Sequence, residues 1–442
     1  MYEVLLIGGV ILWIAMAALY ARSGIASVFH PATFYMFFHG FIFVVRPIIA
    51  YVSDYQAVYR IYSFIPTWDA KITALLVANL GFICFMAAVI RAGNVPLILA
   101  PTNGQADDTQ RGFRNALMIA AALLGPIGIY SLSYILQGDG TTTVGMAYDA
   151  ASGNTISTTG NGYLFTAGDV VGALAVLIAW QFRFRAVALI PFALYVVARA
   201  SFGGMRWTFL LTSAALALFW LYDRRRNWPS IPVLAGAVAL LFGFAVIGQQ
   251  RDIVRAYLTG GQIRTDIFED RLLEGMDFAN MEYLEFQTWA IPNKTNTWGY
   301  FVDNLQVLTE PIPRVLWKNK PIGAPIQMWD LYQYGTPIGM SSSLPGYGWD
   351  QLGYIGVVIW CSLWGWLFGL FYNWFARSRQ TSFTVGLYLL LLPMTVQMYR
   401  DGGLLSALKF PMWFVITVAI WKVVALLFDR GGLRVVPGVT AR

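Results

Sequence analysis

A polar segment at residues 251–350 interrupts an otherwise apolar chain. It opens with RDIVRAYLTGGQIR (251–264), contains PIPRVLWKNKPIGAP (311–325) and closes with SSSLPGYGWDQLGYIG (341–356). Apolar segments long enough to cross a bilayer lie on both sides of it. We therefore predict a membrane domain at 1–248, a long loop at 249–349, and a second membrane domain with a tail at 350–442.

The composition excludes an ordinary soluble protein. Of the 442 residues, 57% are hydrophobic and only 12% are charged, and the mean hydropathy is +0.58. Soluble domains carry about 25% charged residues, enough to cover their surface in water. The sequence predicts an all-α polytopic membrane protein with about eleven spans. We expect the spans near 1–20, 31–52, 69–91, 115–136, 163–182, 186–203, 206–222, 231–248, 350–375, 382–399 and 405–427.

The basic residues in short loops predict the orientation. The net charge of +7 would suggest nucleic acid in a soluble protein, but here it follows the positive-inside rule, so we expect no nucleic-acid partner. The run DRRR (223–226), then Arg377 and Arg379, and the tail mark the cytoplasmic side. The N-terminus is then outside and the C-terminus inside. Within the outer loop, we expect amphipathic helices on the membrane surface near 264–290, with their acids in solvent.

Metal and cofactor motifs are missing from the sequence. The two cysteines, Cys84 and Cys361, fall in predicted spans, and no HExxH, CxxC, DxD or P-loop pattern occurs. We therefore predict no metal site and no cofactor.

Basic residues on the predicted outer side are the informative ones. Within a span an arginine costs about 2.5–3.5 kcal/mol at the centre, so such residues point to a function. Guanidinium groups bind phosphate oxygens in a bidentate manner, which predicts an anion site. A salt bridge, or a side chain reaching lipid phosphate, would also explain any single arginine. The set comprises Arg46, Arg199, Arg206, Arg251, Arg255, Arg314, Lys318, Lys320 and Arg400.

A short outer turn, MYRDGG (398–403), places Arg400 beside Asp401. The two glycines favour a tight turn that brings both charges into a cavity, although a local ion pair at the membrane interface is the alternative. Asp350 and Asp401 are the candidate general bases among many acids. Trp317, Tyr347 and Trp349 could stack on sugar rings or anchor the membrane interface.

Two motifs resemble the Wzy-type polymerases of O-antigen and exopolysaccharide repeat units. IPRVLWKNKPIG (312–323) is similar to the end of their outer loop, and SLPGYGWDQLGYIGVVIWCSLWGWLFGLFY (343–372) is similar to the turn and span that follow. FGGMRW (202–207) resembles an earlier Gly/Ser-Arg motif of the family. The family often has a glutamate where this chain has Tyr347, and Asp350 lies three residues further on.

The resemblance implies a GT-C-like glycosyltransferase of the bacterial inner membrane. Its donor would be a growing glycan on undecaprenyl diphosphate, and its acceptor a lipid-linked repeat unit on the periplasmic side. The reaction would need no metal, because fixed arginines stabilise the diphosphate leaving group. Membrane lipids, a flippase and a chain-length regulator would be its partners. Arg206, Arg314 and Arg400 are expected at the diphosphate, with Arg46, Arg199, Arg251, Arg255 and Lys320 as further substrate contacts.

Two other functions fit the same features. An O-antigen ligase would use the same donor, but such enzymes usually rely on a histidine in the outer loop, and His30 and His39 lie elsewhere. A flippase or transporter would carry polar residues along a path through both leaflets. Here the charges within spans gather toward the outer half, which favours a site on one side.

Overall fold

The computed structural model describes residues 1–99, 107–137, 146–149, 154–157, 166–201, 206–236, 273–312, 316–317, 319–321, 323–336 and 341–430. The first part of the chain contains α1 (Tyr2–Arg22), α2 (Pro31–His39), the π-helical turn η1 (Gly40–Val45), α3 (Arg46–Ser53), α4 (Ala57–Ile61) and α5 (Trp68–Ala92). The middle part contains α6 (Asp107–Gln137), the strands β1 (Met146–Asp149) and β2 (Asn154–Ser157), α8 (Asp169–Gln181), α9 (Ala186–Ser201) and α10 (Arg206–Asp223). The strands pair in an antiparallel hairpin.

The last part of the chain carries the loop elements and four further helices. The loop contains η3 (Met276–Phe278), α12 (Asn280–Ala290), η4 (Val302–Leu305), α13 (Gln306–Thr309) and η5 (Leu331–Gln333). It leads into α14 (Leu344–Arg377), α15 (Ser382–Asp401), α16 (Leu404–Lys409) and α17 (Met412–Arg430). These helices form one bundle with the first and middle parts, because α5 packs along α14 and α10 packs against α15.

The helical membrane class is confirmed, whereas the count of about eleven spans stays a prediction. Seven of the described helices are long and apolar enough to cross a membrane. Three shorter apolar helices occupy Asp169–Gln181, Ala186–Arg199 and Thr208–Asp223, where we predicted further spans. Most of the span predicted at 231–248 lies outside the described residues. The first helix exposes Val4, Ile7, Ile11 and Ile14, as expected for side chains that face lipid.

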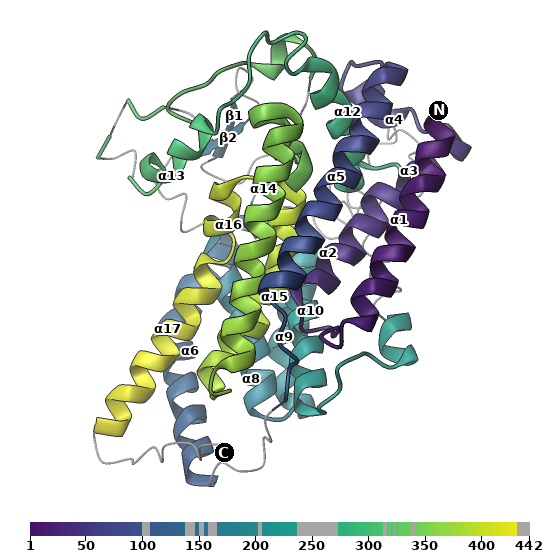
Figure 1. The fold of residues 1–442 in the computed structure, drawn as a ribbon. Coiled ribbons are helices and arrows are strands. Elements are labelled where there is room, and N and C mark those ends of the chain that lie inside the picture. Colours follow the sequence, from purple (N-terminus) through teal and green to yellow (C-terminus); the bar gives the residue numbers. More distant parts are fainter. Residues whose placement is uncertain are drawn as a thin grey trace.

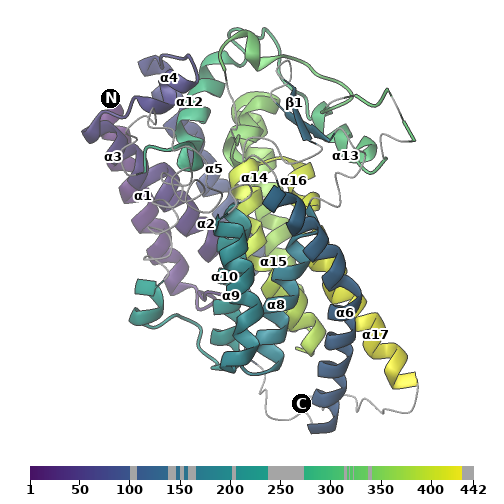
Figure 2. The ribbon, with the colours of Figure 1, turned by 180° about the vertical axis from the view of Figure 1, so that it is seen from behind.

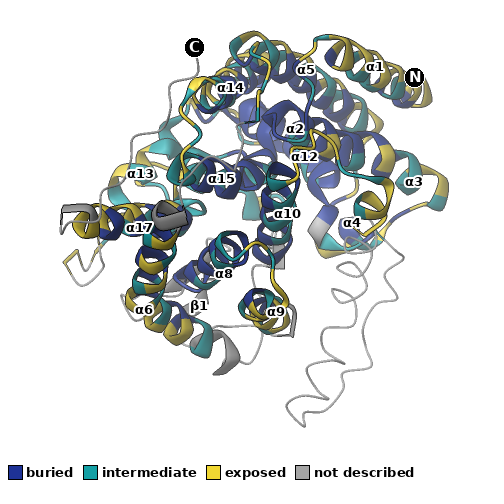
Figure 3. Cartoon of the chain, turned by 90° about the horizontal axis from the view of Figure 1, so that it is seen from below, coloured by how far each residue is buried: buried dark blue, intermediate teal, exposed yellow. Residues whose placement is uncertain are grey.

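The bundle has two distinct ends, which Figure 1 and the reverse view in Figure 2 show. The loop end carries the start of α1, α4, α12, α13, the start of α14 and α16. The tail end carries the last turns of α14 and α17. Viewed along the bundle, α15 lies in the middle and is largely buried, whereas α1, α6 and α17 lie at the rim (Figure 3). The N-terminus and the loop thus lie at the same end of the bundle.

Helix α14 is the element that joins the loop to the membrane. Its cap is Ser343, whose hydroxyl accepts a hydrogen bond from the Gly346 amide, 3.3 Å away. It begins at Leu344, ahead of the predicted boundary at 350, and breaks at Leu352 and Gly353. Gly353 has φ +60°, a conformation that favours glycine. The break leaves a short buried segment, which holds Tyr347 and Asp350, above the span proper.

Small residues allow α14 to approach α5 closely. A Cβ added at Gly365 would lie 2.5 Å from the carbonyl oxygen of Phe85, so only glycine fits there. Such close contacts hold helices together in lipid, where the hydrophobic effect does not drive association.

The prediction of surface amphipathic helices near 264–290 is wrong for the part that the structure describes. Nine of the residues in α12 are buried, including Glu282 and Glu285. The acids are buried because they have partners: Glu282 pairs with Arg46, and Glu285 accepts a hydrogen bond of 2.6 Å from the Tyr59 hydroxyl. Helix α12 is thus an internal wall of the loop end. Residues 264–272 lie outside the described part.

Candidate functional site

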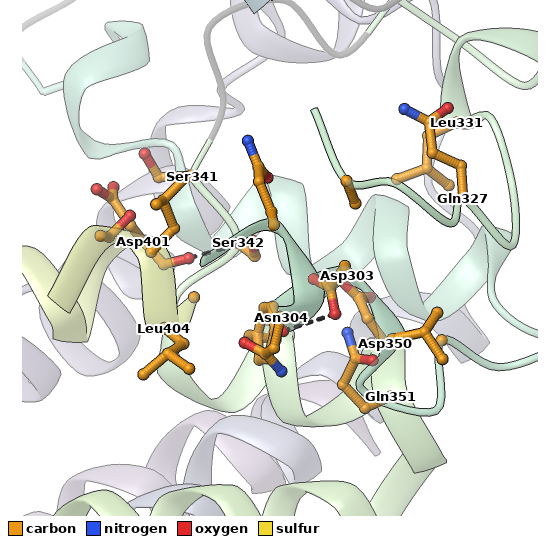
Figure 4. Close-up of a pocket in the computed structure, with 18 of the residues that line it drawn as sticks. Asp303, Asn304, Gln327, Leu331, Ser341, Ser342, Asp350, Gln351, Asp401 and Leu404 are labelled. Atoms are coloured by element: carbon orange, nitrogen blue, oxygen red, sulfur yellow. Dashed lines mark hydrogen bonds between the residues drawn. The ribbon is translucent and has the colours of Figure 1, made fainter. Parts of the chain in front are cut away.

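A cavity of about 890 Å³ opens between the loop and the helix ends beneath it. The start of α14, the turn between α15 and α16, α12, η4 and the segment 324–332 form its wall. Figure 4 shows Asp303, Asp350 and Gln351 on one side, and Asp401 with Ser341 and Ser342 on the other. Elements far apart in the sequence therefore meet at one concave site, which is the usual arrangement for a ligand site.

Asp350, near the start of α14, lies on one side of this cavity. It is only 7% exposed, and its Oδ2 accepts a hydrogen bond from the side-chain amide of Gln287 on α12. Its Oδ1 has no hydrogen-bond partner within the described part of the chain. The Asp350 carbonyl oxygen accepts from the Gly299 amide at 2.9 Å, which fixes the loop against α14. A buried carboxylate with one oxygen hydrogen-bonded and the other without a partner is a candidate proton acceptor.

A second carboxylate, Asp303, lies on the same side. The Tyr347 hydroxyl donates to its Oδ1 at 2.7 Å. Burial raises the pKa of Asp303, and the Tyr347 hydrogen bond offsets part of that rise. Sequence reasoning did not single out Asp303, because nothing in its local sequence distinguishes it from the other acids of the loop. Asp303 and Tyr347 are 44 positions apart in the sequence, and only the fold of the loop brings them together.

The other side of the cavity is the basic elbow, which we define as residues 400–409 at the turn from α15 into α16. Arg400 Nη1 lies 3.5 Å from Asp401 Oδ1, and both side chains are less than one-fifth exposed. The Ser343 amide and the Asn280 side-chain amide donate to the Arg400 carbonyl oxygen at 2.7 and 2.9 Å. Gly402 ends α15 with φ +76°. The elbow is therefore fixed to both the loop and α14.

Lys409 adds a second cation to the basic elbow. It lines the cavity, and its Nζ lies 3.4 Å from Glu310 Oε1. Lys320 also pairs with Glu310, at 3.6 Å, and does not line the cavity. The lining includes more acids than cations, namely Asp303, Asp330, Asp350 and Asp401 against Arg400 and Lys409. An anionic ligand group would therefore lie against the elbow and away from Asp350.

Several predicted residues lie elsewhere. Trp349 donates from its indole nitrogen to the Ile291 carbonyl oxygen at 3.0 Å, and Trp317 is partly exposed in the loop. Arg206 is the first residue of α10, and its side chain lies outside the described part. Arg251, Arg255, Arg314 and Lys318 also lie outside the described residues. Of the predicted set, the structure brings together Arg400, Asp401, Asp350 and Tyr347.

Arg46 and Arg199 do not line the cavity. The Arg46 guanidinium, which is fully buried, pairs with Glu282 on α12 and donates from Nε to the Leu273 carbonyl oxygen at 3.0 Å. Arg199 pairs with Asp169, and both side chains are buried. Each guanidinium thus pairs with a buried carboxylate, as expected if these two arginines form salt bridges within the fold and do not bind an anionic ligand. The two arginines hold α12 and the α8–α9 pair in place.

Arg46→Ala should destabilise the fold, because it leaves Glu282 buried without its cation. The expected loss is about 3–5 kcal/mol of unfolding free energy. Replacing both partners, Arg46→Met with Glu282→Leu, should recover most of that loss. Thermal unfolding in detergent micelles measures both effects. A single variant with unchanged melting but reduced turnover would instead assign Arg46 to the substrate.

Glu285 predicts a pH dependence of stability. Burial raises its pKa from 4.5 to about 7, and the nearby charge of Lys71 opposes this rise. The folded state binds the Glu285 proton more tightly than the unfolded chain, so this contribution is fully present below about pH 4.5. It is lost as the pH rises through about 7. Thermal unfolding from pH 5 to 8 should show this fall in the wild type, and Glu285→Gln should flatten it.

Within the described residues, no group of three or more His, Cys, Asp or Glu side chains is placed to hold a metal ion. No protein-family model, no curated protein and no solved structure matches this chain.

Proposed function

We propose that this chain is a membrane-embedded glycosyltransferase that extends a glycan carried on a polyprenyl diphosphate. The observation that carries the proposal is the composition of the cavity at the loop end. The lining combines two cations of the basic elbow, Arg400 and Lys409, with a buried carboxylate, Asp350, whose Oδ1 has no hydrogen-bond partner within the described part of the chain.

The two sides of the cavity match the two demands of the reaction. A hydroxyl of the acceptor sugar attacks the anomeric carbon of the donor, and a new glycosidic C–O bond forms. The bond from that carbon to the diphosphate oxygen breaks, and the diphosphate leaves with the electron pair. Asp350 accepts the hydroxyl proton. Arg400 and Lys409 stabilise the negative charge that develops on the diphosphate.

The rest of the lining suits a sugar. Tyr283, Trp329 and Tyr332 offer aromatic faces, and the side-chain amides of Asn304, Gln327 and Gln351 offer donors and acceptors. This mixture of rings and amides favours a hydroxyl-rich ligand over an apolar one. The position of the cavity at one end of the bundle favours a reaction on one membrane face over a transport path.

We also propose the location, fold and partners that the family resemblance implies. The loop end would face the periplasm of a bacterial inner membrane, with the end of α17 in the cytoplasm. The fold would be GT-C-like with about eleven spans. A flippase would supply lipid-linked repeat units, and a chain-length regulator would act with the enzyme.

Reconstitution into lipid vesicles tests this function. Purified protein given undecaprenyl-diphosphate-linked repeat units should produce longer lipid-linked chains. Transfer only to an added lipid A core would identify a ligase. Movement of the lipid-linked glycan across the vesicle membrane without bond formation would identify a flippase. Either outcome would contradict the polymerase assignment.

A further inference from the structure

A second pocket, of about 300 Å³, lies at the loop end on the other side of α12. Its wall comes from the start of α1, from α3 with the following turn, from α4, from the start of α5 with the two residues Ile65 and Pro66 nearby, and from α12. Tyr283 on α12 lines the main cavity, whereas Glu282 and Glu285 line this pocket. The helix therefore separates two pockets, and the smaller one is lined by none of the residues proposed for the transfer step, Asp350, Arg400 and Lys409.

Aromatic rings surround an ammonium group in this pocket. Lys71 Nζ lies 5.1 Å from the ring centre of Tyr59, 5.7 Å from that of Trp68 and 6.0 Å from that of Tyr2. No carboxylate in the described part of the chain lies within 4 Å of it. Trp68 is 60% exposed, so much of its ring remains available.

Three carboxylates also line the pocket, together with apolar side chains such as Ile65 and Met281. Glu282 pairs with Arg46, Glu285 accepts a hydrogen bond from the Tyr59 hydroxyl, and Asp54 accepts one from the side-chain amide of Gln56 at 2.6 Å. The pocket is also firmly built, since Glu274 Oε1 accepts from the Gln56 and Ala57 amides, each at 2.7 Å. The turn between α3 and α4 is thereby fixed to the segment that precedes α12.

The charges of the pocket decide which ligand it suits. A cationic ligand would meet Lys71, and an anionic ligand would meet the carboxylates of Asp54, Glu282 and Glu285. A neutral ring with hydroxyl groups avoids both conflicts, because it accepts hydrogen bonds from the ammonium and donates to the carboxylates. The aromatic walls attract the polarised C–H face of such a ring. The volume lies at the lower limit for small-molecule sites, about 300 Å³.

We propose that this pocket binds a neutral sugar unit, separately from the cavity where Asp350 and Arg400 lie. Sugar binding at this pocket can be measured without turnover, so its test does not depend on the proposed transferase activity.

Saturation-transfer NMR on the full chain in nanodiscs tests this site. The probes are the methyl glycosides of glucose, galactose, mannose and N-acetylglucosamine, with glucuronate and glucosamine as charged counterparts. We expect at least one neutral sugar to bind. Trp68→Ala and Lys71→Gln should each weaken that binding about tenfold, as expected for one lost ring contact or charged hydrogen bond.

Two matched variants complete the design. Trp228→Ala removes another exposed tryptophan, outside this pocket, and should leave sugar binding unchanged. Asp350→Asn should also leave the Trp68-dependent binding unchanged, although it lowers the rate of chain extension. Preference for glucuronate or glucosamine, absence of neutral-sugar binding, or full binding by both folded pocket variants would overturn the proposal.

Discussion

Asp350→Asn should lower the rate of glycan extension by about 10²–10⁴-fold, the usual contribution of a general base. The asparagine is nearly isosteric, and its side-chain oxygen can still accept the hydrogen bond that Gln287 donates to Asp350. It places an NH₂ donor where the unpaired carboxylate oxygen lies. Thus proton acceptance is lost while the fold is kept. Single-turnover assays with lipid-linked repeat units in vesicles measure the rate.

Asp69→Asn is the matched control, because Asp69 is an exposed aspartate in the first turn of α5. It should extend glycans at the wild-type rate. A wild-type rate for the folded Asp350→Asn protein would show that Asp350 is not the general base. Asp303, the neighbouring carboxylate of the same wall, would then be the next candidate.

Arg400→Gln should lower the rate by about 10²–10³-fold, the range found when one group that stabilises a developing anion is removed. The loss should appear in turnover more than in the apparent affinity for the acceptor, because the leaving diphosphate gains charge in the transition state. The backbone contacts at this residue use its carbonyl oxygen, so they survive the substitution. Steady-state kinetics over a range of acceptor concentrations separate the two effects.

Arg60→Gln provides the control for charge alone, since Arg60 is an exposed arginine of α4, a helix at the same end of the bundle. It should extend glycans normally. Equal losses in Arg60→Gln and Arg400→Gln would point to a general electrostatic effect of the loop end, and would contradict a specific role for Arg400.

Local patterns in the sequence predicted the features that depend on neighbouring residues. Hydropathy over about 20 residues identifies helices that cross a bilayer, and the structure confirms this class. The glycines that follow Arg400 and Asp401 predicted a tight turn, which is found at Gly402. Asp350 and Tyr347 were singled out from the stretch that enters α14, and both line the cavity.

Features that depend on distant contacts could not be predicted in this way. Arg46 and Glu282 are 236 positions apart, so nothing local indicates that they form a buried pair. Glu282 and Glu285 were expected in solvent because α12 alternates acids with apolar residues, a pattern typical of a surface helix. Lys409 lies at the end of the short helix α16 and lines the cavity. The sequence does not distinguish this helix from the span that follows, so Lys409 was not predicted at the site.

The central claim is that the lipid diphosphate and the sugar lie in the cavity between the basic elbow and Asp350. A cryo-EM structure with a non-reactive undecaprenyl-diphosphate glycan bound in a nanodisc measures this directly. The account predicts the diphosphate against Arg400 and Lys409, with the first sugar beside the unpaired oxygen of Asp350. A diphosphate bound at the tail end, or at the loop end but away from the basic elbow, would contradict it.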